Sequence, residues 1–147
     1  MKILVIGDSH GNISNLKHVM GFAKNINAGA VIHTGDWNKF DNIKTVTDFG
    51  TPLYSCLGNA DIDPRFTFKK FIRFKIDGVK IGIVHSIKNL KLIKNYKLKI
   101  KNLGIIFCGH THKQRQEKKV INPGALENGI NFAVFDTETK GVEFIQE

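Results

Sequence analysis

The sequence predicts an α/β (α+β) fold in which two packed β-sheets are flanked by helices. The first half alternates buried strands with helical segments, which is typical of parallel strands joined by right-handed crossovers. The second half carries two hairpin patterns, which require antiparallel pairing. With 147 residues, 41% of them hydrophobic, the chain is long and apolar enough for one core. We therefore expect a single domain over residues 1–147.

Three strands and two helices are predicted before residue 60. Lys2 to Ile6 is a continuous apolar run, as in a strand buried on both faces. A helix is predicted between an N-cap at Ser14 and a stop at Gly29. Residues 30–34 and 52–57 are predicted strands, with a short helix over 42–49 between them. Functional side chains of such sheets gather beyond the carboxyl ends of the strands.

The remaining residues favour antiparallel structure. Asp77-Gly78 between two apolar runs predicts a hairpin over residues 66–85, because Asp-Gly suits a tight turn. Apolar residues at helical spacing predict one lysine-rich helix over 87–102. A buried strand over 105–108, an exposed strand over 114–121 and a closing hairpin over 131–145 complete the chain.

Residues that can bind a metal ion follow five of the apolar runs. They are Asp8, His10, Asp36, Asn59, His85, His110 and His112. Taken singly, each has an ordinary explanation: Asp8 as a helix cap, His10 or His85 as a satisfied histidine, Asn59 as a turn residue. The repetition at strand ends instead indicates one shared site.

This donor set predicts a chemistry. Seven oxygen and nitrogen donors are too many for one ion but suit two ions that share a carboxylate. Mixed imidazole and carboxylate ligands favour manganese, nickel, iron, zinc or cobalt over magnesium and calcium, and manganese is our first expectation. Two metals about 4 Å apart hold a bridging hydroxide and clamp phosphate oxygens. The predicted reaction is hydrolysis of a phosphoester, without a protein nucleophile.

The order of these motifs resembles a known family. G-D-x-H, G-D, G-N-x-D, V-H, G-H-T-H and N-P-G occur in the order found in calcineurin-like metallophosphoesterases, specifically their small single-domain phosphodiesterase branch. The resemblance implies a four-layer αββα sandwich of two mixed sheets around a two-metal centre.

The resemblance also implies roles for the donors. Asp8, His10, Asp36 and His112 would bind the first metal, and Asp36, Asn59, His85 and His110 the second, which makes Asp36 the bridge. Asn59 would also bind the substrate phosphate, and the catalytic residues would be Asp36, Asn59 and His85. Asp61 would support the loop from behind the metal ligands, and His33 is expected to support or pack rather than to bind metal.

Two positions depart from the family pattern. Many members carry a histidine after the metal-binding asparagine, where it can protonate the leaving group, but this chain has Ala60. General acid catalysis typically contributes about 10² to 10⁴ in rate, so we expect slower turnover or a need for good leaving groups. A glycine that often follows the strand-end histidine is Ser86 here.

Composition restricts the partners. A formal charge of +9 favours an anionic or phosphorylated partner, but most of the cationic residues are lysine, so nucleic acid is open and not favoured. The aromatic and basic stretch over 66–75 is read as an amphipathic strand in preference to a base-stacking platform. No run is long enough for a membrane span, and buried, reduced Cys56 and Cys108 fit the cytoplasm.

The sequence thus predicts a cytoplasmic, two-metal phosphodiesterase that acts on a small phosphodiester or nucleotide-type substrate through a metal-bridging hydroxide. A homo-oligomer is possible. The alternatives are a phosphomonoesterase or nuclease on the same metals, or a scaffold of low activity that binds protein partners, because the fold also resembles the small subunit of the retromer coat.

Overall fold

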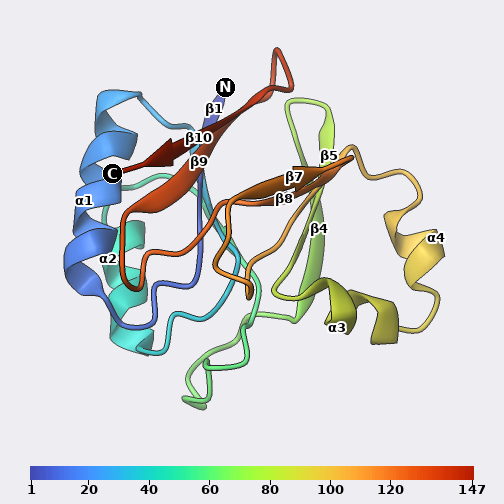
Figure 1. The fold of residues 1–147 in the computed structure, drawn as a ribbon, viewed down its shortest axis with the longest axis horizontal. Helices are drawn as coiled ribbons and strands as arrows, with labels where there is room; N and C mark the ends of the chain where they lie inside the picture. Colours follow the sequence, from blue (N-terminus) through green and yellow to red (C-terminus); the bar gives the residue numbers. More distant parts are fainter.

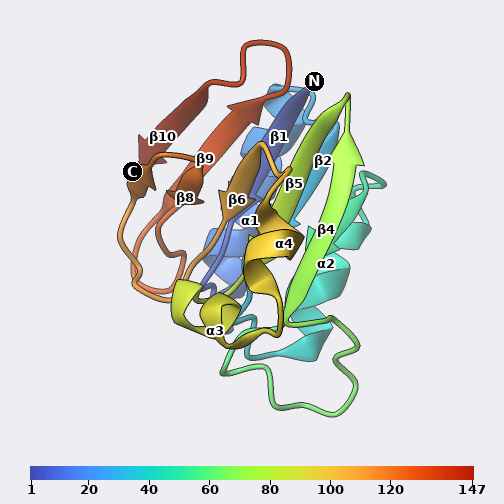
Figure 2. The ribbon, with the colours of Figure 1, turned by 90° about the vertical axis from the view of Figure 1, so that its right-hand side faces the viewer.

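The computed structural model describes all 147 residues and has two mixed, five-stranded sheets packed face to face. Helices cover the outer face of each sheet, which confirms the predicted four-layer sandwich (Figure 1, Figure 2). The first sheet has the order β10-β9-β1-β2-β3 and the second the order β4-β5-β6-β8-β7.

The first sheet combines both halves of the chain. β1 is parallel to β2 and antiparallel to β9, so the last hairpin is added beside the first strand. α1 (Ile13–Asn25), a short 3₁₀ turn (Phe40–Asn42) and α2 (Ile43–Thr47) cover its outer face (Figure 1). The strands are β1 (Lys2–Ile6), β2 (Ala30–His33), β3 (Leu53–Ser55), β9 (Asn131–Asp136) and β10 (Val142–Gln146).

The second sheet has the same mixed character. β5 is antiparallel to β4 and parallel to β6, and β8 is parallel to β6 and antiparallel to β7. α3 (Ile87–Leu92) and α4 (Tyr96–Ile100) lie on its outer side (Figure 2). The strands are β4 (Phe71–Ile76), β5 (Val79–Val84), β6 (Ile105–Phe107), β7 (Arg115–Glu117) and β8 (Val120–Asn122).

Successive side chains of β1 point to opposite faces of the sheet, and both faces are buried. Ile3 and Val5 point into the core between the sheets, where Phe107 and Phe135 also pack. Leu4 and Ile6 point to the other face and contact the α1 side. A strand with two buried faces reads as an unbroken apolar run, as the sequence predicted.

The N-terminus of α1 differs from the prediction. Asn12, not Ser14, is the N-cap, because its side-chain oxygen accepts the backbone N–H of Asn15 at 3.0 Å. The helix also ends at Asn25, four residues before the predicted stop at Gly29, since the chain must turn into β2 at Ala30. The Asn12 side chain, and not that of Ser14, therefore caps the free N–H groups at the start of α1.

The predicted helix over 87–102 is wrong as a single element. Ile93 is extended at ψ 129° and Asn95 is left-handed at φ +60°, which divides it into α3 and α4. Ile93, Tyr96 and Ile100 still pack against the small outer core around Leu90. The apolar pattern therefore predicted correctly which side chains are buried, but it did not predict the break in the helix at residues 93–95.

Two predicted strands are also shorter than expected. The strand over 114–121 is instead the β7–β8 hairpin, which turns at Lys118 with φ +54°. β4 begins at Phe71, and the preceding Phe66 and Phe68 pack against the core beside α1 and α2. Phe74 stacks on Tyr54 at a ring distance of 4.0 Å. The aromatic side chains of this stretch are thus used in packing.

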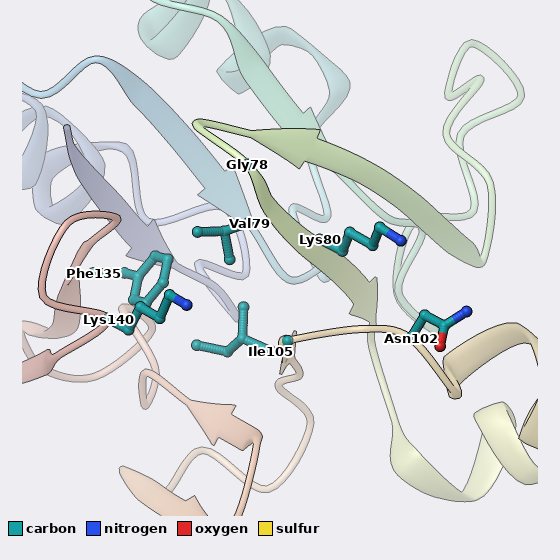
Figure 3. Close-up of a pocket in the computed structure, with 8 residues that line it drawn as sticks. Gly78, Val79, Lys80, Asn102, Ile105, Phe135 and Lys140 are labelled. Atoms are coloured by element: carbon teal, nitrogen blue, oxygen red, sulfur yellow. The ribbon is translucent and has the colours of Figure 1, made fainter.

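A hollow of about 360 Å³ lies at the end of the sandwich where β5 and β6 begin. Figure 3 shows Val79, Ile105 and Phe135 along its wall, with the Lys80 and Asn102 side chains set apart. It is therefore a depression between the two sheets that combines an apolar wall with two lysines, Lys80 and Lys140. No helix of the structure is long and apolar enough to cross a membrane.

Candidate metal centre

The predicted donors meet at the opposite end of the sandwich. Asp8, Asp36, Asn59, His85 and His110 each lie within five residues after the end of β1, β2, β3, β5 or β6. These strands all deliver their carboxyl ends to one edge, the lower edge in Figure 1. Loops from both sheets therefore bring residues that are far apart in sequence into contact.

One group of donors joins Asp8, His10 and His112, whose potential ligand atoms all lie within 4.8 Å of one another. His112 Nε2 is 3.4 Å from Asp8 Oδ1 and 3.3 Å from His10 Nε2. His10 Nε2 in turn lies 3.4 Å from Asp36 Oδ2. The four residues predicted for the first metal therefore lie near one another.

A second group joins Asp8, Asp36 and His85, again within 4.8 Å. His85 Nε2 is 3.1 Å from Asp36 Oδ2 and 3.9 Å from Asp8 Oδ1. Asp36 Oδ2 thus faces His10 on one side and His85 on the other, which is the geometry expected of a bridging carboxylate. Asp8 also contacts both groups.

Two buried atoms at this point have no hydrogen-bond partner: Asp8 Oδ1 and His85 Nε2. Most buried polar atoms of folded proteins are paired, so unpaired atoms that face each other require an explanation. His85 Nδ1 contacts the Thr34 carbonyl oxygen at 2.8 Å, which accounts for the other ring nitrogen and leaves Nε2 free to bind metal. The residues present therefore fit a divalent metal ion.

Backbone conformation aims these side chains. Five of the seven predicted donors have φ between +42° and +75°: Asp8, His10, Asp36, His110 and His112. Non-glycine residues rarely adopt this left-handed region, and such residues cluster at functional sites where the surrounding structure holds them. The loops after β1, β2 and β6 thus share this left-handed backbone at their donors.

Glycines allow the loops to approach this closely. A Cβ on Gly58 would lie 2.2 Å from Asp36 Oδ1, and a Cβ on Gly109 would lie 2.5 Å from Asp8 Oδ2. Real Cβ atoms do not approach other atoms so closely. The glycine before Asn59 and the glycine before His110 are therefore required by the packing of the carboxylates behind them.

Backbone N–H groups hold the two carboxylates. Asp8 Oδ2 accepts the N–H of His110 at 3.0 Å, and Asp36 Oδ1 accepts the N–H of Ala60 at 2.8 Å. In each residue one oxygen is fixed to the neighbouring loop while the other faces the centre. The loops that carry the donors are consequently linked in pairs.

Asp61 and His33 lie behind the donors. The buried Asp61 carboxylate accepts the N–H groups of Asp36, Asn38 and Gly58 at 2.8 to 3.0 Å. It therefore ties the loop after β2 to the loop after β3, the supporting position that the sequence predicted for it.

His33 is fully buried and stacks on Trp37 at a ring distance of 3.7 Å. Its Nδ1 accepts the N–H of Gly35, so Nε2 carries the proton and donates to Ser9 Oγ at 3.0 Å. Burial holds the pKa of His33 well below its usual value, which keeps the ring neutral. His33 thus connects the loops of Asp8 and Asp36 without pointing at the centre.

The donors perturb one another electrostatically. Burial raises the pKa of Asp8, against the opposing charges of His85 and His112. Burial would also raise the pKa of Asp36, but the close His85 ring and the Ala60 N–H lower it to about 2. Burial disfavours charge on His85, yet Asp36 and the Thr34 carbonyl raise its pKa. Such clustered shifts are typical of functional sites.

Asn59 and His110 complete the predicted set on the outer side. The His85 and His110 rings lie edge to face with centroids 5.2 Å apart. Asn59 is exposed and lines a cavity of about 320 Å³ together with His85. His110 lines a neighbouring cavity of about 540 Å³. Five of the seven predicted donors thus meet in the two groups above, and Asn59 and His110 lie beside them next to His85.

No sequence motif indicated one acidic neighbour of the centre. Glu127 Oε2 lies 3.7 Å from His112 Nδ1 and 3.9 Å from His10 Nε2. It lies five residues after the end of β8 but belongs to no metal motif, so only its position in space marks it. The sequence also did not indicate Asn122 as a support, although its amide donates to the Gly109 carbonyl and to Thr111 Oγ1 at 3.0 Å.

Comparison with known proteins agrees with this geometry. Phosphodiesterase MJ0936 of Methanocaldococcus jannaschii is 26% identical over 160 aligned positions, which cover 95% of each protein. The solved structure of an archaeal phosphodiesterase superposes with a TM-score of 0.82 at 25% identity, over 100% of both chains. Zinc-bound Vps29 of Entamoeba histolytica has a TM-score of 0.67 at 18% identity and covers 100% of this chain and 98% of its own, which shows a shared fold alone.

The family model of the calcineurin-like phosphoesterase superfamily domain matches residues 1–140, which is nearly the whole chain. The resemblance predicted from the motifs is thereby confirmed. The chain belongs to the calcineurin-like phosphoesterase superfamily, a family of metal-dependent phosphoesterases.

Proposed function

We propose that this protein is a two-metal phosphodiesterase with the ligand sets predicted above and Asp36 as the bridge. The observation that carries the proposal is the pair of buried, unpartnered atoms Asp8 Oδ1 and His85 Nε2, 3.9 Å apart. When bound, two divalent ions supply a hydroxide at neutral pH and positive charge for the phosphate oxygens. Manganese is expected, with nickel, iron, zinc and cobalt as competitors.

The chain's own residues have defined tasks in this reaction. Asp36 is held ionised by its neighbours, so it can face both sites as a carboxylate. Asn59 is exposed and lines the same cavity as His85, where its amide N–H can donate to a phosphate oxygen. The carbonyl of Thr34 fixes the His85 ring by its contact with Nδ1.

The shape around the centre supports a diester. One cavity contains His85 and Lys70, and the other contains His110 and Lys88. A phosphodiester has two ester arms and one negative charge, whereas a monoester has one arm. A cavity next to each of two neighbouring donors, each with a lysine and a carboxylate in its lining, offers space for one arm on either side, of a small or nucleotide-type substrate.

The leaving group has no side-chain acid at the position where many family members carry histidine. Ala60 contributes its backbone N–H to Asp36 Oδ1, but its methyl group has no proton to give. Esters with good leaving groups should therefore react best, because they depart without protonation.

The test is hydrolysis of bis-p-nitrophenyl phosphate and p-nitrophenyl phosphate by metal-stripped protein supplied with manganese, nickel, zinc or magnesium. Diester turnover that requires added metal and disappears in Asp36→Ala and His85→Ala is the expected result. Preference for the monoester would contradict diester specificity and support a phosphomonoesterase.

Absence of turnover with every metal, despite two bound ions, would favour the rival function of a protein-binding scaffold. Nuclease activity is the remaining alternative, and a single-stranded oligonucleotide in the same assay tests it. We also retain a cytoplasmic location as part of the proposal, and cell fractionation tests it.

A further inference from the structure

A carboxylate reaches the candidate metal centre from a segment that carries none of the seven donors. Glu127 Oε2 is 3.7 Å from His112 Nδ1 and 3.9 Å from His10 Nε2. Its side chain is 37% exposed, so the carboxylate lies at the border between the centre and solvent. No family motif of the sequence includes this residue.

The backbone beside Glu127 is fixed to the first metal loop. The N–H of Leu126 donates to the Gly7 carbonyl at 3.2 Å, and Asn12 Nδ2 donates to the Glu127 carbonyl at 2.8 Å. Asn15 Nδ2 donates to the Leu126 carbonyl at 2.8 Å. Glu127 is therefore attached to the same loop and helix start that position Asp8 and His10.

The orientation of His112 shows which of its nitrogens faces Glu127. His112 Nε2 lies 3.4 Å from Asp8 Oδ1, so Nε2 is the atom turned to the centre and Nδ1 is turned to Glu127. Imidazoles that bind metal commonly donate their other N–H to a carboxylate, which fixes the ring and raises its basicity. A movement of about 1 Å would shorten the 3.7 Å separation to hydrogen-bond length.

His112 is more exposed than His10 and His85 and has less support from buried groups. Its side chain is 37% exposed, compared with 17% for His10 and 2% for His85. His85 is fixed by the buried carbonyl of Thr34, whereas the only acceptor found close to His112 Nδ1 is Glu127. An exposed ring without an acceptor retains rotational freedom, which metal binding would have to remove.

We propose that Glu127 is a positioning residue of the metal centre: its carboxylate accepts the Nδ1–H of His112 and adds negative charge beside His10. This inference rests on the proposed ligand set and extends it by one residue. The segment that follows Asn122-Pro123-Gly124 would thus help to position the metal ligands His10 and His112.

The test is titration of metal-stripped protein with Mn²⁺ by isothermal calorimetry for the wild type, Glu127→Gln, Glu127→Asp and Glu138→Gln. Glu138 is exposed in the turn after β9 at the other end of the sandwich, so Glu138→Gln removes the same charge far from the centre. Loss of a supporting carboxylate typically weakens metal binding about 10- to 100-fold. We expect that loss for one of the two ions in Glu127→Gln, a smaller loss in Glu127→Asp, and none in Glu138→Gln.

A second measurement separates positioning from folding. The thermal midpoint of the metal-free protein should be the same for the wild type and Glu127→Gln. Equal Mn²⁺ affinities of these two proteins, or a lowered metal-free midpoint that accounts for the loss, would overturn the inference. Wild-type protein that binds two ions but hydrolyses no diester would contradict only the proposed function, whereas wild-type protein that binds no Mn²⁺ would overturn both.

Discussion

Removal of the Asp61 carboxylate should destabilise the protein and weaken metal binding together. Asp61 Oδ2 accepts the N–H groups of Asp36 at 3.0 Å and Gly58 at 2.8 Å, and Oδ1 accepts that of Asn38 at 3.0 Å. In Asp61→Ala, the first two donors stay buried without an acceptor, while the N–H of exposed Asn38 can reach water.

The magnitude follows from these three bonds. A buried donor left without an acceptor costs about 1–3 kcal/mol, so Asp61→Ala should lower the free energy of unfolding by about 4 kcal/mol. In Asp61→Asn, the amide oxygen can retain the two buried donors, while the NH₂ group faces the N–H of Asn38. We expect a loss of about 1–2 kcal/mol for this variant.

Urea unfolding of the metal-stripped protein, followed by circular dichroism, measures the loss of stability in Asp61→Ala and in Asp61→Asn. With a slope of about 2 kcal/mol per molar urea, Asp61→Ala should shift the midpoint by about 2 M. Asp63→Asn is the matched control, because Asp63 forms an ion pair with Arg65 at the surface, where solvent screens such pairs and their contribution to stability is small. A loss below about 1 kcal/mol in Asp61→Ala, with unchanged Mn²⁺ affinity, would refute this account of the two loops.

Three further predictions follow from the site. Gly109→Ala should reduce Mn²⁺ affinity at least tenfold in calorimetry, because the new Cβ would lie 2.5 Å from Asp8 Oδ2; unchanged affinity would show that the loop can move aside. Cys56 and Cys108 should not react with Ellman's reagent at pH 8 in the folded protein but should both react in guanidinium. The reason is that both thiols are buried and that burial raises the pKa of Cys108 to about 11. Rapid reaction of the native protein would contradict this prediction. Ala60→His should raise kcat/KM for a diester with a poor alkoxide leaving group more than for bis-p-nitrophenyl phosphate, by up to about 10², and equal effects on both substrates would argue against a missing acid.

The local sequence determined the elements that are buried and regular. β1 was predicted at its observed bounds because a strand covered on both faces must be apolar throughout. The β4–β5 turn was predicted from the Asp77-Gly78 pair, which suits positive φ at both positions, and the structure has φ of +48° and +78° there. The candidate donors were likewise readable, since each follows a strand and the carboxyl ends of these strands meet at one edge.

Breaks within polar segments were not readable from sequence. Asn95 and Lys118 both adopt positive φ. Asparagine adopts this region more often than most residues, but the apolar helical pattern runs through Asn95, and nothing marks Lys118 for a turn. The N-cap at Asn12 depended on which of two nearby side chains reached the free N–H groups. These choices were made by packing against the outer core and the neighbouring loops.

The sequence by itself determined the layers of the sandwich and the identity of the seven candidate donors, because burial periodicity and residue chemistry are local properties. Only the tertiary structure decided how the donors face one another, since Asp8 Oδ1 meets His85 and His112 across loops more than seventy residues apart. It alone also brought Glu127 to His112, through hydrogen bonds from Asn12 and Asn15. Proximity of this kind results from the packing of the whole chain, which no short pattern of residues records.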